Sequence, residues 1–278
     1  MCGRYTLTDD GTELWEVIEA SVPKELRKGL HETDVHAALC APERRRFNVV
    51  PTSHEPVILA EEGFATIHTA HWWICPAWAS GQVIWKSDAH GGKSFAWKGP
   101  RKSHFNSRWD TVTDPSNRYW HGLLEQKRCL VPADGFVEWP DDALRDKEQP
   151  KIPRYFGLHA RRPFFFAGVY DVATDDTGTP FLSFNILTVE PNALLRALPH
   201  HRMPAILTEE SVGEWLDPRV SAAQAATLLR PTQDDRMVSY PITTRVNLAR
   251  NEAPDLLMPV ELPAGRPVEL PDSPRLDL

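Results

Sequence analysis

The chain has 278 residues, 41% of them hydrophobic and 25% charged, which is enough apolar material to bury a core of globular size. Its formal net charge of −7 excludes a uniformly cationic nucleic-acid-binding protein but is compatible with a local basic groove. No apolar run approaches the roughly 18–20 residues of a membrane-spanning helix, and the N-terminus lacks a signal-peptide pattern. These properties predict an intracellular protein without a membrane partner.

The order of the predicted elements indicates a β-rich α+β protein. Strands at 56–60 and 64–74 are joined by a short turn, and strands at 163–173 and 181–190 by a longer one. Because the strands come in hairpins and do not alternate with helices, a doubly wound sheet is not expected. The remaining predicted elements are helices at 11–20, 191–198, 209–216 and 220–229 and a strand at 237–243.

Two segments differ in composition from the rest of the chain. Residues 263–278 are rich in proline, with PVELP at 267–271 repeating the motif at 259–263, and we expect a disordered tail there after a single domain at 1–262. Residues 82–105 alternate basic residues with aromatic ones, and their glycines predict a loop. This loop either contacts single-stranded nucleic acid, with Lys98, Arg101 and Lys102 facing phosphates, or is a surface loop pinned to the body by its aromatic rings.

Cys2 follows the initiator methionine directly. Removal of Met1 would leave a terminal residue with a free α-amine, whose pKa lies near 7.7–8.0, and a thiol on the adjacent carbon. Such a pair attacks aldehydes, because the amine forms a Schiff base that the thiol captures as a five-membered ring. The plainer interpretation is that Met1 stays or that the cysteine is incidental. The four cysteines show no zinc spacing, so neither a metal nor another cofactor is expected.

Three further segments place polar residues among apolar ones. Glu138 follows Val137 and precedes Trp139, which suits either a carboxylate with a raised pKa or an edge-strand glutamate that points to solvent. His200 and His201 lie between prolines in ALPHHRMPAIL, and either histidine could be an acid/base or both could be part of a polar turn. Asn106 and Arg108 are two residues apart, so a strand would place an amide and a cation on one face.

Seven motifs in this order resemble the SOS response-associated peptidase (SRAP) family of abasic-site processing proteins. They cover most of the chain, and Cys at position 2 is one of their features. The motifs are MCGRY at 1–5, FNVVPTS at 47–53, HWWICPAWA at 71–79, FNSRWDTV at 105–112, CLVPADGFVEW at 129–139, HHRMPAIL at 200–207 and TTRVNLARNEAPDLLMPV at 243–260.

The resemblance implies a twisted, barrel-like fold of antiparallel strands with peripheral helices around a DNA-binding cleft. It implies that Cys2, after loss of Met1, crosslinks covalently to the ring-opened aldehyde of an abasic site in single-stranded DNA as a thiazolidine. Glu138, His200 and Asn106 match the family's catalytic carboxylate, histidine and amide. The positions expected to contact DNA are Arg4, Pro51, Trp78, Arg108 and Arg118, together with Lys98, Arg101 and Lys102 of the basic segment. We expect a cytoplasmic monomer, associated with the nucleoid if the source is bacterial.

The chain departs from the family pattern at three places, one of which is the basic and aromatic segment at 82–105, which is long for the family. His201 stands where an acid usually follows the active-site histidine, which should lower the pKa of His200. The asparagine motif contains N-S-R-W-D-T where N-A-R-x-E-T is usual, with the asparagine and the arginine retained.

Three other functions stay open at this point. An N-terminal-cysteine amidotransferase would use the same amine and thiol, but it would continue into an apolar strand after Gly3 and carry an RGPD-like loop, which this chain lacks. A single-strand-binding module would need no covalent step. A peptidase limited to its own N-terminus is compatible with crosslinking.

Overall fold

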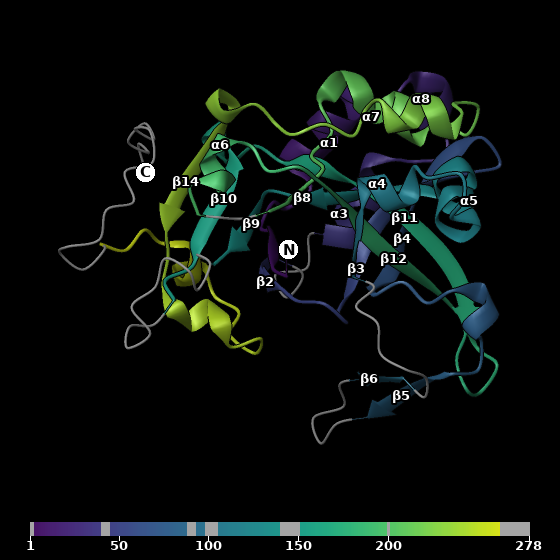
Figure 1. The fold of residues 1–278 in the computed structure, drawn as a ribbon, viewed down its shortest axis with the longest axis horizontal. Coiled ribbons are helices and arrows are strands. Elements are labelled where there is room, and N and C mark those ends of the chain that lie inside the picture. Colours follow the sequence, from purple (N-terminus) through teal and green to yellow (C-terminus); the bar gives the residue numbers. More distant parts are fainter. Residues whose placement is uncertain are drawn as a thin grey trace.

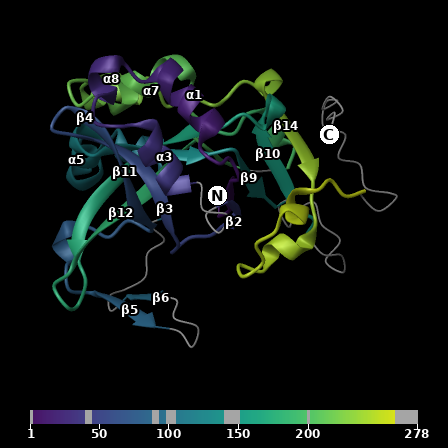
Figure 2. The same cartoon turned by 180° about the vertical axis from the view of Figure 1, so that it is seen from behind.

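The computed structural model describes residues 3–39, 45–87, 93–97, 105–139, 151–198 and 201–261. These residues form two main sheets with helices around them (Figure 1; seen from behind in Figure 2). The β-rich α+β class and the barrel-like arrangement predicted from the sequence are confirmed. The predicted tail at 263–278 lies outside the described residues, as do Cys2, His200, Lys98, Arg101 and Lys102.

One sheet has five strands, and each neighbouring pair in it is antiparallel. The N-terminal strand occupies an interior position in this sheet, although it is only three residues long. The strands, in spatial order, are β14 (Met237–Pro241), β10 (Arg154–Leu158), β9 (Gly135–Glu138), β1 (Tyr5–Leu7) and β2 (Arg46–Val49).

The second sheet closes on itself, because its first strand pairs at one side with β8 and at the other with β12. The parallel pairing of β12 with β4 completes the ring. Closure leaves few unpaired strand edges. The ring consists of β11 (Phe164–Thr174), β8 (Arg128–Ala133), β3 (His54–Glu61), β4 (Phe64–Trp72) and β12 (Pro180–Val189), and β12 also pairs with β7 (Asn106–Arg108) and β13 (Met203–Pro204).

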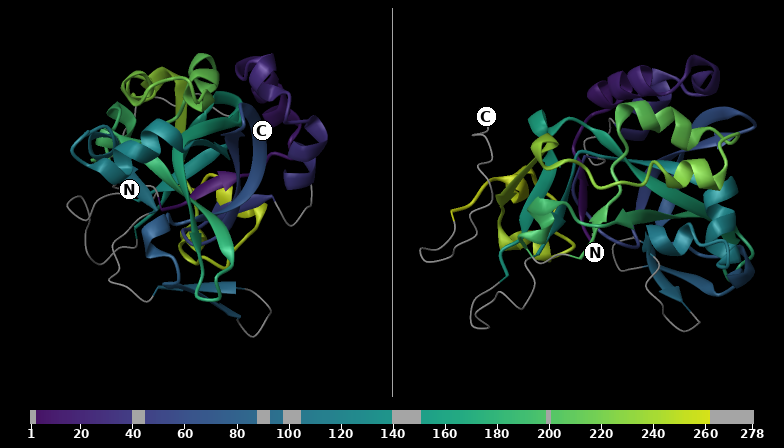
Figure 3. Two further views of the ribbon diagram at one scale, coloured as in Figure 1. Left: turned by 90° about the vertical axis from the view of Figure 1, so that its right-hand side faces the viewer. Right: turned by 45° about the horizontal axis from the view of Figure 1, so that its top comes forward.

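The helices lie at the periphery, most of them on one side of the sheets (Figure 1; Figure 3, right). None of the helices within the described residues is long and apolar enough to cross a membrane. The α-helices are α1 (Thr12–Ser21), α2 (Lys24–Arg27), α3 (Glu32–Leu39), α4 (Trp109–Val112), α5 (Arg118–Gln126), α6 (Ala193–Arg196), α7 (Glu209–Leu216) and α8 (Ala222–Ala226), and the 3-10 turns are η2 (Ala77–Ala79), η4 (His159–Arg161), η5 (Asp234–Arg236), η6 (Thr244–Asn247) and η7 (Pro254–Leu257).

The main core contains residues of both sheets and of the helices. A buried arginine fastens two of the helices to it. Arg128 donates hydrogen bonds to the carbonyls of Leu124 at the end of α5 (2.6 Å), Trp215 in α7 (2.7 Å) and Asp217 (2.6 Å). Because a buried cation needs partners, these carbonyl groups fix α5 and α7 relative to β8.

The segment at 82–105 corrects one prediction. It contains a two-stranded hairpin, β5 (Val83–Ser87) and β6 (Lys93–Trp97), where the sequence predicted a loop. Trp85 packs on His71 (4.9 Å between ring centroids) and on Phe181 (5.3 Å). Burial, and secondarily His54, lowers the pKa of His71 to about 3, so this ring contributes as a neutral aromatic partner. At least one aromatic residue of the segment therefore pins it to the body.

We predict that Gly135→Ala lowers the free energy of unfolding by about 1–3 kcal/mol, because a Cβ at this position would overlap the buried ring of Tyr155. Gly122→Ala is the matched control, since a Cβ there meets nothing within 4 Å and the change raises helix propensity in α5 by about 0.5–1 kcal/mol. Urea denaturation measures both variants. Equal midpoints would contradict the prediction.

Candidate active site

The start of the chain runs beside the end of β9. Tyr5 pairs with Phe136, and the amide of Val137 donates to the carbonyl of Arg4 (3.0 Å). This ladder brings Gly3, the first described residue, level with Glu138. Cys2, which precedes Gly3 directly in the chain, lies outside the described residues.

Glu138 ends β9 and is 2% exposed. The interpretation of this residue as a solvent-facing edge glutamate is therefore wrong. Its cross-strand neighbour in β10 is Arg154, which donates to the hydroxyl and the carbonyl oxygen of Ser239 (both 3.2 Å). Burial lowers the pKa of Arg154 to about 10, which leaves it a cation at neutral pH.

Asn106 begins β7 and is 9% exposed. Its position depends on Trp72, whose indole nitrogen donates to the carbonyl of Phe105 (2.8 Å). The Trp72 ring also packs edge-on against Tyr5 of β1, with 5.0 Å between the ring centroids. A single buried tryptophan thus links the asparagine motif to the strand that leads in from the N-terminus.

Arg108 is exposed at the other end of β7. Its side chain is 55% exposed and its Nε donates to Asp110 at 2.9 Å, and this hydrogen bond lowers the pKa of Asp110. The expected strand is present, with Asn106 and Arg108 two residues apart in β7, but the Asn106 side chain is buried and the Arg108 side chain is exposed.

Arg202 was not among the residues that the sequence singled out as a candidate. Its side chain is 15% exposed, with Nη2 3.8 Å from Asp110, and its buried Nη1 has no hydrogen-bond partner among the residues described. Strand pairing explains the proximity, because Thr188 of β12 pairs with Arg108 on one side and with Pro204 of β13 on the other. An arginine two residues after His200 was the available signal in the sequence.

Asp110 therefore lies between two arginines, Arg108 and Arg202. Glu190 also acts on the charge of Arg108 and accepts a hydrogen bond from the indole nitrogen of Trp109 (2.9 Å), so two carboxylates face the two guanidinium groups. Guanidinium groups match phosphate geometry, so Arg108 and Arg202 suit a phosphate that takes the place of Asp110. His201 is exposed in the same segment.

The other predicted contact residues form a second region. Trp78 is 74% exposed on η2, and Arg118 is exposed at the first turn of α5. Each is adjacent in the chain to a residue that binds Asp171. Trp78 follows Ala77, whose amide donates to this carboxylate at 2.9 Å, and Arg118 precedes Tyr119, whose hydroxyl donates to it at 3.1 Å. Asp171 thus fixes the elements that carry the exposed indole and the exposed cation.

Pro51 lies in the turn between β2 and β3. The next residue, Thr52, has a positive φ of 79°, an uncommon conformation for a β-branched residue. Two backbone hydrogen bonds hold it there, from the Thr52 amide to the Trp72 carbonyl (2.9 Å) and from the Trp72 amide to the Ser53 carbonyl (2.8 Å). The Pro51 turn is therefore fixed to the same Trp72 that positions Asn106.

The two described cysteines do not suit nucleophilic chemistry. Cys75 and Cys129 are both 0% exposed, and burial raises the pKa of Cys75 to about 12 and that of Cys129 further. Within the described ranges, no group of three histidine, cysteine or acidic side chains has the arrangement of a metal site.

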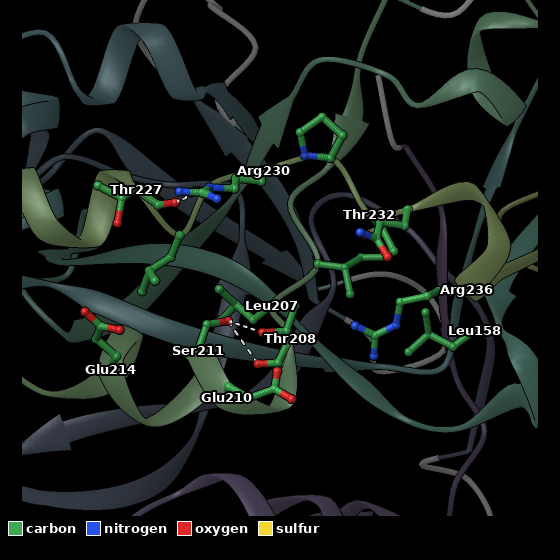
Figure 4. A pocket seen from close by; sticks show the side chains of 14 residues that line it. Leu158, Leu207, Thr208, Glu210, Ser211, Glu214, Thr227, Arg230, Thr232 and Arg236 are labelled. Atoms are coloured by element: carbon green, nitrogen blue, oxygen red, sulfur yellow. Dashed lines mark hydrogen bonds between the residues drawn. The ribbon is translucent and has the colours of Figure 1, made fainter.

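A pocket of about 460 Å³ lies apart from these residues, between α7 and the segment that follows α8. Arg230 and Arg236 reach toward it opposite Glu210 and Ser211 (Figure 4). Its walls include none of the residues that the sequence predicted for the site.

These features define a β-rich α+β protein whose N-terminal strand is drawn into the sheet beside a buried glutamate. The chain belongs to the SOS response associated peptidase (SRAP) family, whose model matches residues 1–249. It is 30% identical over 259 residues to the abasic site processing protein YoqW of Bacillus subtilis (strain 168), covering 92% of this chain and 99% of that protein.

Two further relatives bear on the sequence and on the fold. The abasic site processing protein HMCES of Gallus gallus is 30% identical over 257 residues, covering 82% of this chain and 69% of that protein. A crystal structure of a protein from Bacteroides thetaiotaomicron superposes with a TM-score of 0.65 at 23% identity, covering 94% of this chain and 100% of that one. The latter likeness establishes a shared fold.

A buried ion pair beside the site leads to a prediction about pH. Arg46 donates to Glu55 (2.5 Å) and to Glu252 (3.1 Å), and burial raises the pKa of Glu55 from 4.5 to about 7 despite the attraction of Arg46. The folded state therefore keeps a proton that the unfolded chain releases. This contribution to stability is complete below about pH 4.5 and is lost as the pH rises through about 7, on the order of 3 kcal/mol.

We expect Glu55→Gln to remove this part of the pH dependence, because the amide is neutral throughout and Arg46 keeps Glu252 as a partner. The measurement is the free energy of unfolding of both proteins between pH 5 and pH 8. Glu61→Gln, at the exposed end of the same strand, controls for the loss of one negative charge. Parallel curves for the wild type and Glu55→Gln would contradict the expectation.

Proposed function

We propose that this chain recognises abasic sites in single-stranded DNA and, after removal of Met1, forms a covalent crosslink to them through Cys2. The names of the relatives, which are abasic site processing proteins, support a role at DNA lesions. The observation that carries the proposal is the pairing of β1 with β9, which sets Gly3, the residue that follows Cys2 in the chain, level with the buried Glu138.

The reaction has two bond-forming steps. The neutral α-amine of Cys2 attacks the aldehyde carbon of the ring-opened deoxyribose, and the carbonyl oxygen leaves as water to give an imine. The thiol sulfur then adds to the imine carbon while its proton passes to the nitrogen, which closes a thiazolidine ring. The sum is one new C–N bond, one new C–S bond and one released water, with no change of oxidation state. Because amine and thiol sit on one skeleton, ring closure is intramolecular and fast.

The neighbouring groups have complementary tasks in this proposal. Glu138 accepts a proton from the α-amine, which must be neutral to attack, and returns it to the departing oxygen. His200 assists sugar-ring opening as an acid/base, and Asn106 holds the substrate oxygen through its amide. Arg4, Arg108 and Arg202 contact the phosphates that flank the lesion.

Non-covalent binding of single-stranded DNA is the alternative function. The exposed ring of Trp78 favours it, because base stacking on an aromatic side chain needs no covalent chemistry. Self-removal of Met1, in line with the name of the family, is compatible with either function.

We predict that mature protein and a single-stranded oligonucleotide with one abasic site form a product that survives denaturing electrophoresis. Cys2→Ala loses this product, because the amine alone gives a reversible imine, but reduction with borohydride restores a trapped band. Glu138→Gln retains the product and slows its formation by about 100-fold. Absence of a band with mature wild-type protein would falsify the crosslinking function, and a resistant band with unreduced Cys2→Ala would refute the role of Cys2.

A second prediction concerns binding to an oligonucleotide without a lesion. Arg108→Ala reduces the slope of log K against log salt by about 0.7, the value for one phosphate contact on a single strand. Trp78→Ala weakens binding by about 1–3 kcal/mol and leaves the salt slope unchanged, because stacking releases no counterions.

The matched control for this experiment is Arg219→Ala. Arg219 is an exposed arginine paired with the acid two residues away, as Arg108 is, but it follows α7. Fluorescence anisotropy over a salt series measures all three variants. A salt slope that changes equally in Arg108→Ala and Arg219→Ala would count against the assigned phosphate contact.

A further inference from the structure

A second, smaller hydrophobic core lies beneath the end of β9. Val137 of β9, Tyr155 of β10 and Ile242 after β14 pack there with Val246 and Leu257 of the C-terminal turns. Residues 244–252, here named the C-terminal clasp, therefore touch the strand that carries Glu138, although more than 100 residues separate them in the chain. The clasp was part of a sequence motif to which no chemical role was assigned.

One residue of the clasp contacts both side chains that flank the proposed site. The side-chain oxygen Oδ1 of Asn247 accepts a hydrogen bond from the indole nitrogen of Trp139 at 2.7 Å, and its main-chain carbonyl lies 3.5 Å from Nη2 of Arg4. The Arg4 guanidinium carbon also lies 6.0 Å from the centroid of the Trp139 ring, at the limit of a cation–π contact. Trp139 follows Glu138 and Arg4 follows Gly3, so Asn247 joins the two chain segments that meet there.

The clasp is held in place independently of the Asn247 side chain. The side-chain nitrogen Nδ2 of Asn48 donates to three carbonyls of the clasp, those of Val246 (3.2 Å), Leu248 (3.1 Å) and Asn251 (3.0 Å). Glu252 accepts from the backbone amides of Phe47 and Asn48 and from Nε of Arg46 (3.1 Å). Truncation of Asn247 should therefore leave the path of the clasp unchanged.

We propose that Asn247 is a positioning residue for the crosslinking reaction, acting through Trp139 and Arg4. Its amide oxygen satisfies the indole N–H of Trp139 and so fixes the orientation of that ring. Arg4 Nη1 donates to the carbonyl of Gly3 at 2.8 Å, and the fixed ring and the Asn247 carbonyl add the restraints on the other side of its guanidinium. A guanidinium held in one direction places the DNA phosphate, and with it the reacting sugar, at a defined distance from the Cys2 amine. This inference rests on the proposed function.

The test is single-turnover crosslinking with the DNA concentration varied. Asn247→Ala is expected to lower the maximal rate about 10-fold and to change the half-saturating DNA concentration less than 3-fold, because other phosphate contacts sustain binding. Asn247→Asp keeps an acceptor for the indole and restores the rate to within about 3-fold of wild type. A merely structural role would lower the melting temperature together with the rate and would not separate the two parameters.

Two controls isolate the contact. Asn251→Ala removes an asparagine of the same clasp, whose side chain donates to the Arg245 carbonyl (2.7 Å) and does not touch Trp139, and it should crosslink at the wild-type rate. Trp139→Phe removes the donor, so Asn247→Ala in that background should have little further effect. Full additivity of the two losses, or an unchanged rate in Asn247→Ala, would overturn the inference while wild-type crosslinking still supports the function. If wild-type protein forms no crosslink, both proposals fall together.

Discussion

The carboxylate of Asp134 holds β1, the first strand of the described chain, in place. It is 2% exposed and accepts hydrogen bonds from the hydroxyl of Thr6 and from the amide and hydroxyl of Thr8 (both 2.5 Å). A buried carboxylate with fewer partners would strongly destabilise the fold, so these bonds hold β1 against the turn between β8 and β9. Since β1 has only three residues, this clamp supplies much of its attachment. The register of β1 against β9, which sets Gly3 level with Glu138, depends on Asp134.

The glycine after Asp134 allows a second restraint on the same turn. The hydroxyl of Tyr155 donates to the Asp134 carbonyl at 2.6 Å, and its ring passes over Gly135 and Gly157, where side chains would collide with it. The ring also belongs to the smaller core that supports the C-terminal clasp. Tyr155 therefore couples the position of β1 to the position of the clasp, which is a reason for two distant parts of the sequence to meet at one site.

Elements with strong local signals were predictable from the sequence. The hairpins of β3 with β4 and of β11 with β12, and helix α7, lie within a few residues of their predicted positions, because alternation and helical periodicity are properties of the local chain. The strands β1 and β7 carry no such signal at three residues each, and they exist only through pairing with distant partners. The hairpin at 82–105 was mistaken for a loop because its glycines and basic residues outweighed the short strands on either side.

In the candidate site, too, local sequence patterns indicated some residues, whereas the pairing of distant strands determined others. That Glu138 matters could be inferred from its apolar neighbours, but its burial depends on β1 and β10, which no local pattern places beside it. Arg202 was missed because its relation to Arg108 arises from the two pairings of β12. The roles of Cys2 and His200 came from the resemblance and stay predictions.

Charge distribution reconciles an acidic chain with an anionic partner. The net charge of −7 acts over the whole surface and is screened over about 8–10 Å at physiological salt, so a phosphate at the site responds mainly to the groups nearest to it. Near β7 those groups are Arg108 and Arg202 with Asp110 between them, and Glu190 close to Arg108. Asp110 restrains both guanidinium groups before the proposed DNA partner binds, which reduces the side-chain entropy lost on binding. Asp110 also neutralises part of the positive charge of the two arginines. The exposed Arg108 can exchange Asp110 for a phosphate more readily than the largely buried Arg202 can.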